Sequence, residues 1–290
     1  MPPQEKTLRI GALNIKTSPA TPETYISLFK KAVNRRTAAN YRGKSFAEIG
    51  TFDVYDTEDE PAFAGQVGTY LDFDPEMPWY NKSAGKEADE QELKTIQIPR
   101  NLKPEFKPIN FIFFPAKHRF FFELALTHSS MAKIIYSILN QQRTHGMGRI
   151  EVLIEQSQEP LEHILSLREL RRLEIVVSKP NPDDTGKYDK IIKERLARQH
   201  ASKMTTVLES EHGVSLTPDK ETLSLANLAL SDGVVRGHGV AENGRVVDTS
   251  TEDHPLLLTV TFNPKVQQAI DKIHETALKA INKIRDRLQK

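Results

Sequence analysis

Six basic side chains and no acidic ones lie within residues 24–47 of this 290-residue chain. Lysine and arginine bind the phosphates of a nucleic acid and release its counterions, which favours association. Tyr25, Tyr41 and Phe46 lie in the same stretch, and aromatic rings can stack on bases. With two arginines from a later strand, these cations form the predicted nucleic-acid-binding set: Lys30, Lys31, Arg35, Arg36, Arg42, Lys44, Arg171 and Arg172.

The following stretch has the opposite charge. Residues 51–92 contain twelve acidic side chains against two basic ones, so the total net charge of +1 hides two opposed local fields. This permits a second interpretation of the basic stretch, in which its cations pair with the carboxylates of residues 53–60 or stabilise a helix C-terminus. The two interpretations differ in whether the cations remain free for a ligand.

Carboxylates offer a different chemistry. Asp72 and Asp74 are two residues apart, so they would point to the same side of a strand. Two carboxylates in that arrangement can hold Mg²⁺, which gives a metal-dependent nuclease as an alternative function, although acidic clusters are also ordinary surface features. The chain lacks the His-Glu-x-x-His, calcium-loop, phosphate-loop and Gly-x-Ser-x-Gly motifs. We therefore name no catalytic residue and expect no cofactor and no bound metal.

The C-terminal segment 264–290 is predicted to be a long helix with a narrow apolar seam. The seam has spacings of four and three residues and consists of Val266, Ile270, Ile273, Ala277, Ala280, Ile284 and Leu288. Such a seam suits a helix that docks on its own domain, and it also suits a coiled-coil contact. A homodimer through residues 265–290, or a protein-interaction subunit, is therefore a third function to test.

The composition of the chain fits a reducing compartment. It contains no cysteine, which excludes disulfides and thiolate metal sites. The first residues do not resemble a signal peptide. The most apolar stretch, around residues 109–126, is interrupted by Pro115, Lys117, His118 and Arg119 and is unsuited to a bilayer. We expect a cytoplasmic protein with no membrane partner.

The elements that position these residues follow from apolar periodicity. Residues 8–15 are predicted to form a strand. A helix is expected to begin at Pro22 after the N-cap Thr21, and it buries Tyr25, Leu28, Phe29 and Ala32. Residues 46–56 and 62–74 are predicted strands, whereas 81–95 are expected to form a polar loop.

From residue 109 the predicted order is ββαβαβ. Its first helix is expected to be capped by Ser129 or Ser130 and to bury Met131, Ile134, Ile135 and Ile138. Further on, a helix is expected after the cap Thr217, and Asn243–Gly244 predicts a hairpin. The fold class is α+β: helices packed on mixed, largely antiparallel sheets with ferredoxin-like elements and a long C-terminal helix. A boundary near Asn181 divides a sheet domain, 1–180, from a smaller α+β domain, 181–290.

Four segments carry a family resemblance: LRIGALNI, WYN, IPRNLKPEFKPINFIFFPAKHRFFFEL and LRRLEIVVSKPNPDD. They resemble a bacterial family of unknown function whose members occur near phage-defence genes. The layout after residue 170 is also similar in topology to RexA, the exclusion protein of phage lambda. The resemblance implies a nucleic-acid-binding, non-enzymatic component or sensor of a phage-defence system, or an interaction subunit of a defence complex, and it supplies no catalytic residue.

Overall fold

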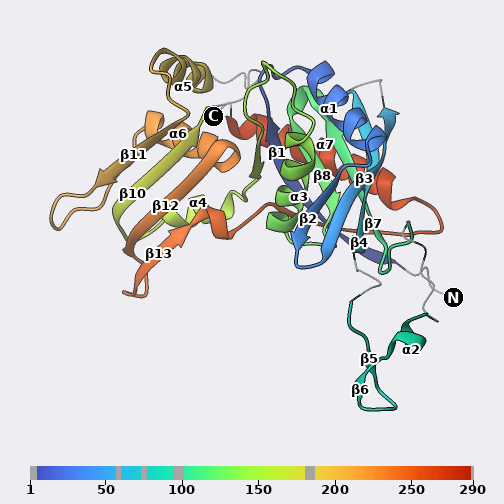
Figure 1. Ribbon diagram of the computed structural model, residues 1–290. Coiled ribbons are helices and arrows are strands. Elements are labelled where there is room, and N and C mark those ends of the chain that lie inside the picture. The colour runs from blue at the N-terminus through green and yellow to red at the C-terminus, as the bar shows by residue number, and fades with distance from the viewer. Residues whose placement is uncertain are drawn as a thin grey trace.

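The computed structural model describes residues 5–56, 60–72, 77–94, 99, 101–179 and 187–288, and its elements form two sheets and a projecting arm (Figure 1). Every strand pairing among these residues is antiparallel. The first sheet has the order β14 (Leu257–Phe262), β1 (Lys6–Lys16), β8 (Arg119–Glu123), β7 (Lys107–Phe114), β4 (Ala62–Leu71), β3 (Ser45–Asp56) and β2 (Ala38–Arg42). An eighth strand, β9 (Glu151–Ile154), pairs with β1 further along the edge that β14 uses.

Part of the first sheet is a ferredoxin-like unit. The elements β1, α1 (Pro22–Asn34), β7, β8, α3 (His128–Asn140) and β9 follow one another in the order βαββαβ, and their strands lie in the order β9-β1-β8-β7. Strands β2 to β4 are inserted between α1 and β7 and extend the sheet beyond β7. The predicted α+β class and its ferredoxin-like elements are thus confirmed.

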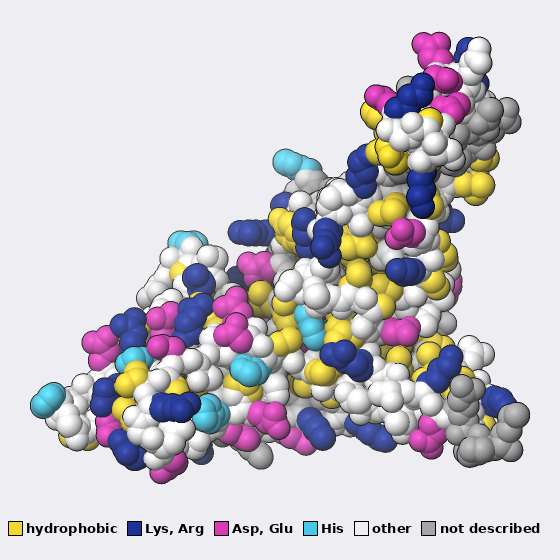
Figure 2. All heavy atoms as spheres, turned by 90° about the horizontal axis from the view of Figure 1, so that it is seen from below, with side chains coloured by type: hydrophobic (Ala, Val, Ile, Leu, Met, Phe, Trp, Pro, Cys, Tyr) yellow, Lys and Arg dark blue, Asp and Glu magenta, His cyan; other side chains and the backbone are white. Residues whose placement is uncertain are grey.

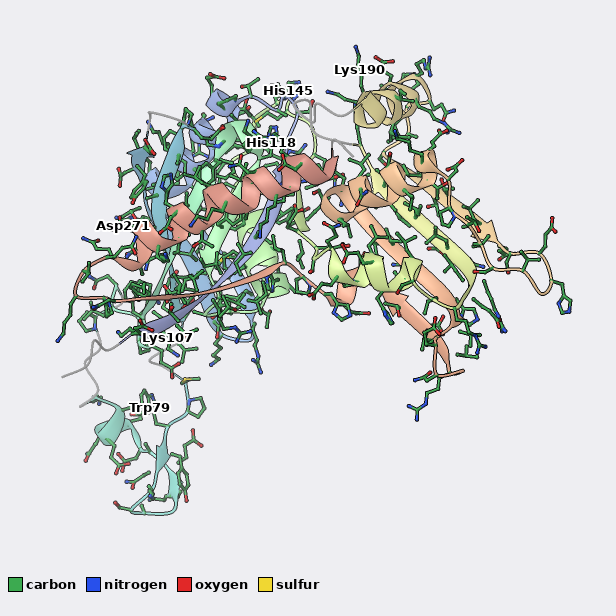
Figure 3. All side chains as sticks on the ribbon, turned by 180° about the vertical axis from the view of Figure 1, so that it is seen from behind. Trp79, Lys107, His118, His145, Lys190 and Asp271 are labelled. Carbon is green, nitrogen blue, oxygen red and sulfur yellow. The ribbon has the colours of Figure 1, made fainter. Side chains whose placement is uncertain are left out.

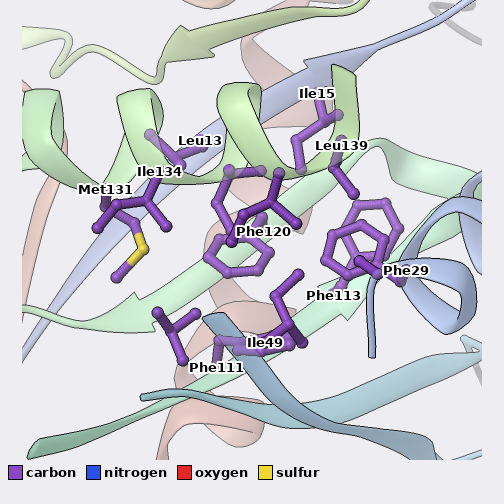
Figure 4. Packing of buried hydrophobic residues seen from close by; sticks show 14 of the residues in the cluster. Leu13, Ile15, Phe29, Ile49, Phe111, Phe113, Phe120, Met131, Ile134 and Leu139 are labelled. Carbon is purple, nitrogen blue, oxygen red and sulfur yellow. The ribbon is translucent and has the colours of Figure 1, made fainter. Parts of the chain in front are cut away.

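Helices α1 and α3 cover one face of this sheet. The four apolar positions predicted for α1 are buried, as are those predicted for α3. Phe29 of α1 stacks on Phe113 with ring centroids 4.9 Å apart, and Phe111 stacks on Phe120 at 4.6 Å (Figure 4). Alternate residues of a strand point to one face, so this aromatic core belongs to the α1/α3 face.

Helix α7 (Ala269–Leu288) lies across the opposite face (Figure 3). Ile273, Ala277, Ala280 and Ile284 are buried. The first three pack with sheet residues such as Ile112 and Phe121. The apolar seam is therefore used within the chain, as the first of its two interpretations predicts. Val266, by contrast, is 82% exposed and precedes the helix.

The second sheet has the order β11 (Lys203–Glu209), β10 (Glu169–Ser178), β12 (Gly233–Val240) and β13 (Val246–Ser250). Its core is shared with α4 (Glu159–Leu165), α5 (Lys187–Arg198) and α6 (Lys220–Asp232). A Cβ at Gly237 would lie 2.4 Å from Ile164, so this glycine lets α4 approach the sheet. The predicted hairpin at Asn243–Gly244 is confirmed as the β12–β13 turn.

The chain returns to the first sheet after β13 through the short helix η2 (Thr251–Asp253), β14 and α7. Strand β10 belongs to the second sheet although it precedes residue 180. The division of the chain at residue 180 stays a prediction.

An arm projects between β4 and β7 (Figure 1). It contains β5 (Tyr80–Asn81), β6 (Lys86–Glu87) and α2 (Glu90–Lys94), where the sequence predicted only a loop. At its base, Lys103 binds Asp72 and the Leu71 amide donates to the Pro104 carbonyl. These two contacts stabilise the base of the arm.

A buried polar cluster joins the two sheets. Lys16 of β1 pairs with Asp232 at the end of α6 at 2.5 Å, and these side chains are 8% and 0% exposed. Asn14 donates to the Asp232 carboxylate at 2.9 Å. Arg119 pairs with Glu155 at 3.2 Å, and Ser231 donates to that carboxylate at 2.7 Å. Two cations and two carboxylates thus balance in the interior, which lowers the high cost of burying charge.

Two local expectations are corrected. The N-cap of α3 is Thr127, whose hydroxyl accepts from the Ser130 amide, and not Ser129 or Ser130. The N-cap of α6 is Asp219 rather than Thr217. Strand β2 was not predicted. A further short helix, η1 (Pro115–Lys117), separates β7 from β8. Over the described part of the chain, no helix combines the length and apolarity that crossing a membrane requires.

The Lys16–Asp232 pair is predicted to matter for stability. Lys16→Met and Asp232→Asn should each lower the free energy of unfolding by about 3–5 kcal/mol, because each leaves a buried charge unpaired. The double variant should lose less than the sum of the two. Chemical denaturation measures all three values. Lys283→Met on the exposed side of α7 is the control, and single losses no larger than the control's would contradict this prediction.

Stability is also predicted to depend on pH through His128 and His274. Burial lowers the pKa of both imidazoles below the usual 6.5, and for His128 the Arg9 charge lowers it further, against a hydrogen bond with Leu256. For His274, Asp56 and Asp271 partly oppose the effect of burial.

The folded state thus binds these two protons less tightly than the unfolded chain. The free energy of unfolding should fall as pH drops from about 7.5 through 6.5, until the lowered folded pKa values are passed. Denaturation curves across this range measure the slope. His128→Gln and His274→Gln should each flatten it, and an unchanged slope in both variants would show that other groups cause the dependence.

Candidate functional site

A groove of about 1140 Å³ lies at the end of the first sheet where the connections to the second sheet pass. Its walls come from six parts of the chain: β1, the β2–β3 hairpin, the start of β7, the segment between β8 and α3, the start of α4, and the segment from η2 to β14. The lining residues that enter the argument below are Arg9, Tyr41, Arg42, Glu105, Lys107, Leu124, Leu126, Thr127, His128, Glu159, Pro160, Asp253, Pro255 and Leu257.

The groove exists because the sheet is uncovered at this end. Strand β8 ends at Glu123, opposite Ile10, whereas β1 and β7 continue past it to Lys6 and Lys107. Helix α3 begins only at His128. By strand alternation, Arg9 points to the same face as Leu13, and Lys107 to the same face as Phe111. Both cations therefore lie on the α1/α3 face, beyond the start of α3.

The β2–β3 hairpin forms another wall. Gly43 occupies its turn with φ of +53°, a conformation that glycine adopts readily. The Asn40 side chain donates to the Gly43 carbonyl at 2.6 Å, and Lys133 of α3 donates to the Tyr41 carbonyl at 3.2 Å. These contacts hold Tyr41 and Arg42 beside the groove.

His128 closes the inner end of the groove. Its ring is buried against Phe122 and Gly11, where a Cβ on the glycine would lie 2.7 Å from Nε2. Nε2 is 3.1 Å from the Leu256 carbonyl. Burial lowers the pKa of His128, and the Arg9 charge lowers it further. The His128 imidazole thus holds the chain before β14, and it lies near the charge of Arg9.

The groove suits an anion at several points. The positive end of the α3 dipole faces it through Thr127, and helix N-termini favour negative charge. Arg9, Arg42 and Lys107 form no ion pair with another residue that the structure describes, so their charges are available to a ligand. Viewed from below, Lys, Arg and His side chains lie among hydrophobic ones in the concave region between the arm and the second sheet (Figure 2).

The structure separates the predicted basic set into three places. Arg42 and Lys44 lie in the β2–β3 hairpin, and Lys44 also contacts Met77 at the base of the arm. Lys30, Lys31, Arg35 and Arg36 lie at the end of α1, before the other end of β2. Arg171 and Arg172 lie on the second sheet. The eight residues thus come from three parts of the fold, and whether each binds a ligand stays a prediction.

Several of these cations have partners in the chain. Arg171 pairs with Glu169 at 2.8 Å, and Arg172 pairs with Glu209 at 2.8 Å and with Glu174 at 3.3 Å. Hydrogen bonds from Arg172 and then Arg236 lower the pKa of Glu174.

Contacts are weaker at the end of α1. There, Arg35 donates to Gln142 and Arg36 to the Gly50 carbonyl, both at 3.4 Å. The predicted pairing of this stretch with carboxylates 53–60 is not seen among the described residues, while residues 57–59 lie outside them.

Only one of the three aromatic candidates lines the groove. Tyr25 is fully buried and donates to the Ile15 carbonyl, so it cannot stack on a base. Phe46 stacks on Tyr70 across two strands. Tyr41 is half-buried and lines the groove.

The carboxylates considered for a metal are not gathered in the described structure. Asp72 binds Lys103, and Asp74 lies outside the described residues. Among the residues that are described, no three His, Asp or Glu side chains are placed to hold a metal ion together. The lining of the groove offers charge, hydrogen bonds and apolar contact to a ligand.

Sequence reasoning missed Arg9, Lys107 and Lys133, because each is an isolated cation outside the basic stretch. A signal for Arg9 was present. It interrupts the apolar segment LRIGALNI at a position with the same alternation as the core residues Leu13 and Ile15. A charge on the core-facing side of a strand indicates that the core does not reach that position.

No curated protein matches this chain. Its residues 6–279 match the family described as "Domain of unknown function (DUF4747)". Because the match spans most of the sequence, the chain belongs to the DUF4747 family.

Proposed function

We propose that this protein binds nucleic acid, and that the groove at the end of the first sheet is its binding surface. The observation that carries the proposal is the convergence of Arg9, Arg42 and Lys107 from three distant segments on one groove, without ion pairs to the described residues. Phosphates are the ligands that such cations and a helix N-terminus bind together. Lys44 and Lys133 extend the basic surface beside Tyr41.

The binding role is non-enzymatic in this proposal. Of the two histidines that line the groove, His128 is held at the Leu256 carbonyl with a pKa that burial lowers. The sequence resemblance adds the biological setting, which is that of a component or sensor in a bacterial phage-defence system, with RexA as a topological parallel. A metal-dependent nuclease and an interaction subunit that dimerises through residues 265–290 remain alternatives with less support.

Loss of a groove cation is predicted to weaken binding. Arg9→Ala, Arg42→Ala and Lys107→Ala should each lower affinity on the order of threefold at low salt, because each removes one phosphate contact. The slope of log K against log salt should become shallower by about 0.7–0.9 per contact. A salt titration by fluorescence anisotropy measures both. Lys283→Ala, on the far side of the sheet, is the matched control, and three groove variants that behave like it would contradict the proposal.

The other basic positions form a separate prediction. Arg171→Ala and Arg172→Ala should change affinity by less than the groove variants, because glutamates already neutralise these arginines. Arg35→Ala and Arg36→Ala test the end of α1 in the same titration. A loss of affinity in Arg171→Ala or Arg172→Ala as large as that in Arg42→Ala would show that the second sheet also contacts the ligand.

A further inference from the structure

We infer that the groove takes an unpaired strand of nucleic acid, with a base seated on its apolar floor and stacked on Tyr41. This inference rests on the proposed binding function and specifies its ligand. It follows from the mixture of groups that line the groove, which differs from that of a purely electrostatic surface.

The apolar part of the groove suits an unpaired strand better than a duplex. Leu124, Leu126, Pro160, Pro255 and Leu257 line it together with Tyr41. In a duplex the base faces are stacked inside, and the surface offers phosphates, sugars and base edges. An unpaired strand exposes base faces, and these gain free energy from contact with apolar and aromatic groups. Leu257, which is 42% exposed, is then covered by the ligand.

The carboxylates of the groove point to the same ligand. Glu105, Glu159 and Asp253 line it beside the three cations, and none forms an ion pair with another described residue. Carboxylates repel phosphates, but they accept hydrogen bonds from the amino groups of bases, as they do from cytosine N4 in the major groove of a duplex. An unpaired base offers, in addition, the amino hydrogen that a duplex uses for pairing, so carboxylates can make more of these contacts with an unpaired strand.

Backbone strain at one of these carboxylates adds support. Glu105 has φ of +58°, in the left-handed region that residues other than glycine seldom adopt. It directly precedes the exposed Phe106 and the groove cation Lys107 at the entry to β7. Residues held in sparsely populated backbone regions cluster where ligands bind.

Different parts of the groove therefore contact different parts of the nucleic acid. Arg9, Arg42 and Lys107 hold the sugar–phosphate backbone, the apolar floor and Tyr41 hold a base face, and the carboxylates hold base amino groups. DNA and RNA share this chemistry, so both enter the experiment.

The test compares probes of equal length, about 16 nucleotides, in the upper range of known single-strand sites. The probes are single-stranded RNA, single-stranded DNA and duplex DNA, with inorganic polyphosphate as a polyanion that has no bases. We expect one or both single strands to bind at least about tenfold more tightly than the duplex or polyphosphate. Tyr41→Ala should weaken single-strand binding about fivefold or more and leave polyphosphate binding unchanged, and Tyr41→Phe should restore it.

Two controls keep the outcomes distinct. Tyr80→Ala, at a 71% exposed tyrosine of the arm that does not line the groove, should leave all affinities unchanged. A single strand that carries 2-aminopurine should lose fluorescence on binding to wild type and to Tyr41→Phe, and not to Tyr41→Ala, since stacking quenches the probe.

Equal affinity for duplex, polyphosphate and single strands, with no effect of Tyr41→Ala, would overturn the inference and leave the binding function standing. Absence of binding to every probe would overturn both.

Discussion

The buried ion pairs Lys16–Asp232 and Arg119–Glu155 fix how the two sheets meet. Their four charges come from β1, β8, the residue after β9 and the end of α6, which are far apart in the sequence. A charge left alone in the interior is costly, so the segments that carry these side chains must come together in one arrangement. The groove depends on this arrangement, because the segments that lead to and from the second sheet supply Glu159, Asp253 and Pro255 to its wall.

Much of the fold could be predicted because apolar period and turn chemistry are local signals. The buried positions of α1 and α3, the cap Thr21 and the β12–β13 turn were all predicted. Strand β2 was missed because AANYR has little β propensity and is held by pairing with β3. The arm was missed because polar contacts stabilise it: Asp89 accepts from the amides of Gln91 and Glu92, and the Glu92 carboxylate accepts from the Asp89 amide.

The candidate site was predictable only in part, because it is assembled from distant segments. Arg42 was found through local charge density, which is a property of neighbouring residues in the chain. Lys107 has no such neighbourhood, and its role depends on where β8 ends and α3 begins. The partners of Arg172 show the same limit. Glu209 lies opposite Arg172 on β11, 37 residues later in the sequence. Only the register of the sheet shows that these two side chains form a hydrogen bond.

The pairing of β1 with β14 affects how the first sheet forms during translation. Residues Lys6–Gly11 of β1 bond to the strand that the ribosome produces last among those of this sheet. Until β14 emerges, one side of β1 carries unsatisfied backbone groups and an apolar surface that α7 has not yet covered. The strand edge of β1 is thus open from its own synthesis until that of β14, when pairing with a neighbouring nascent chain competes with correct closure.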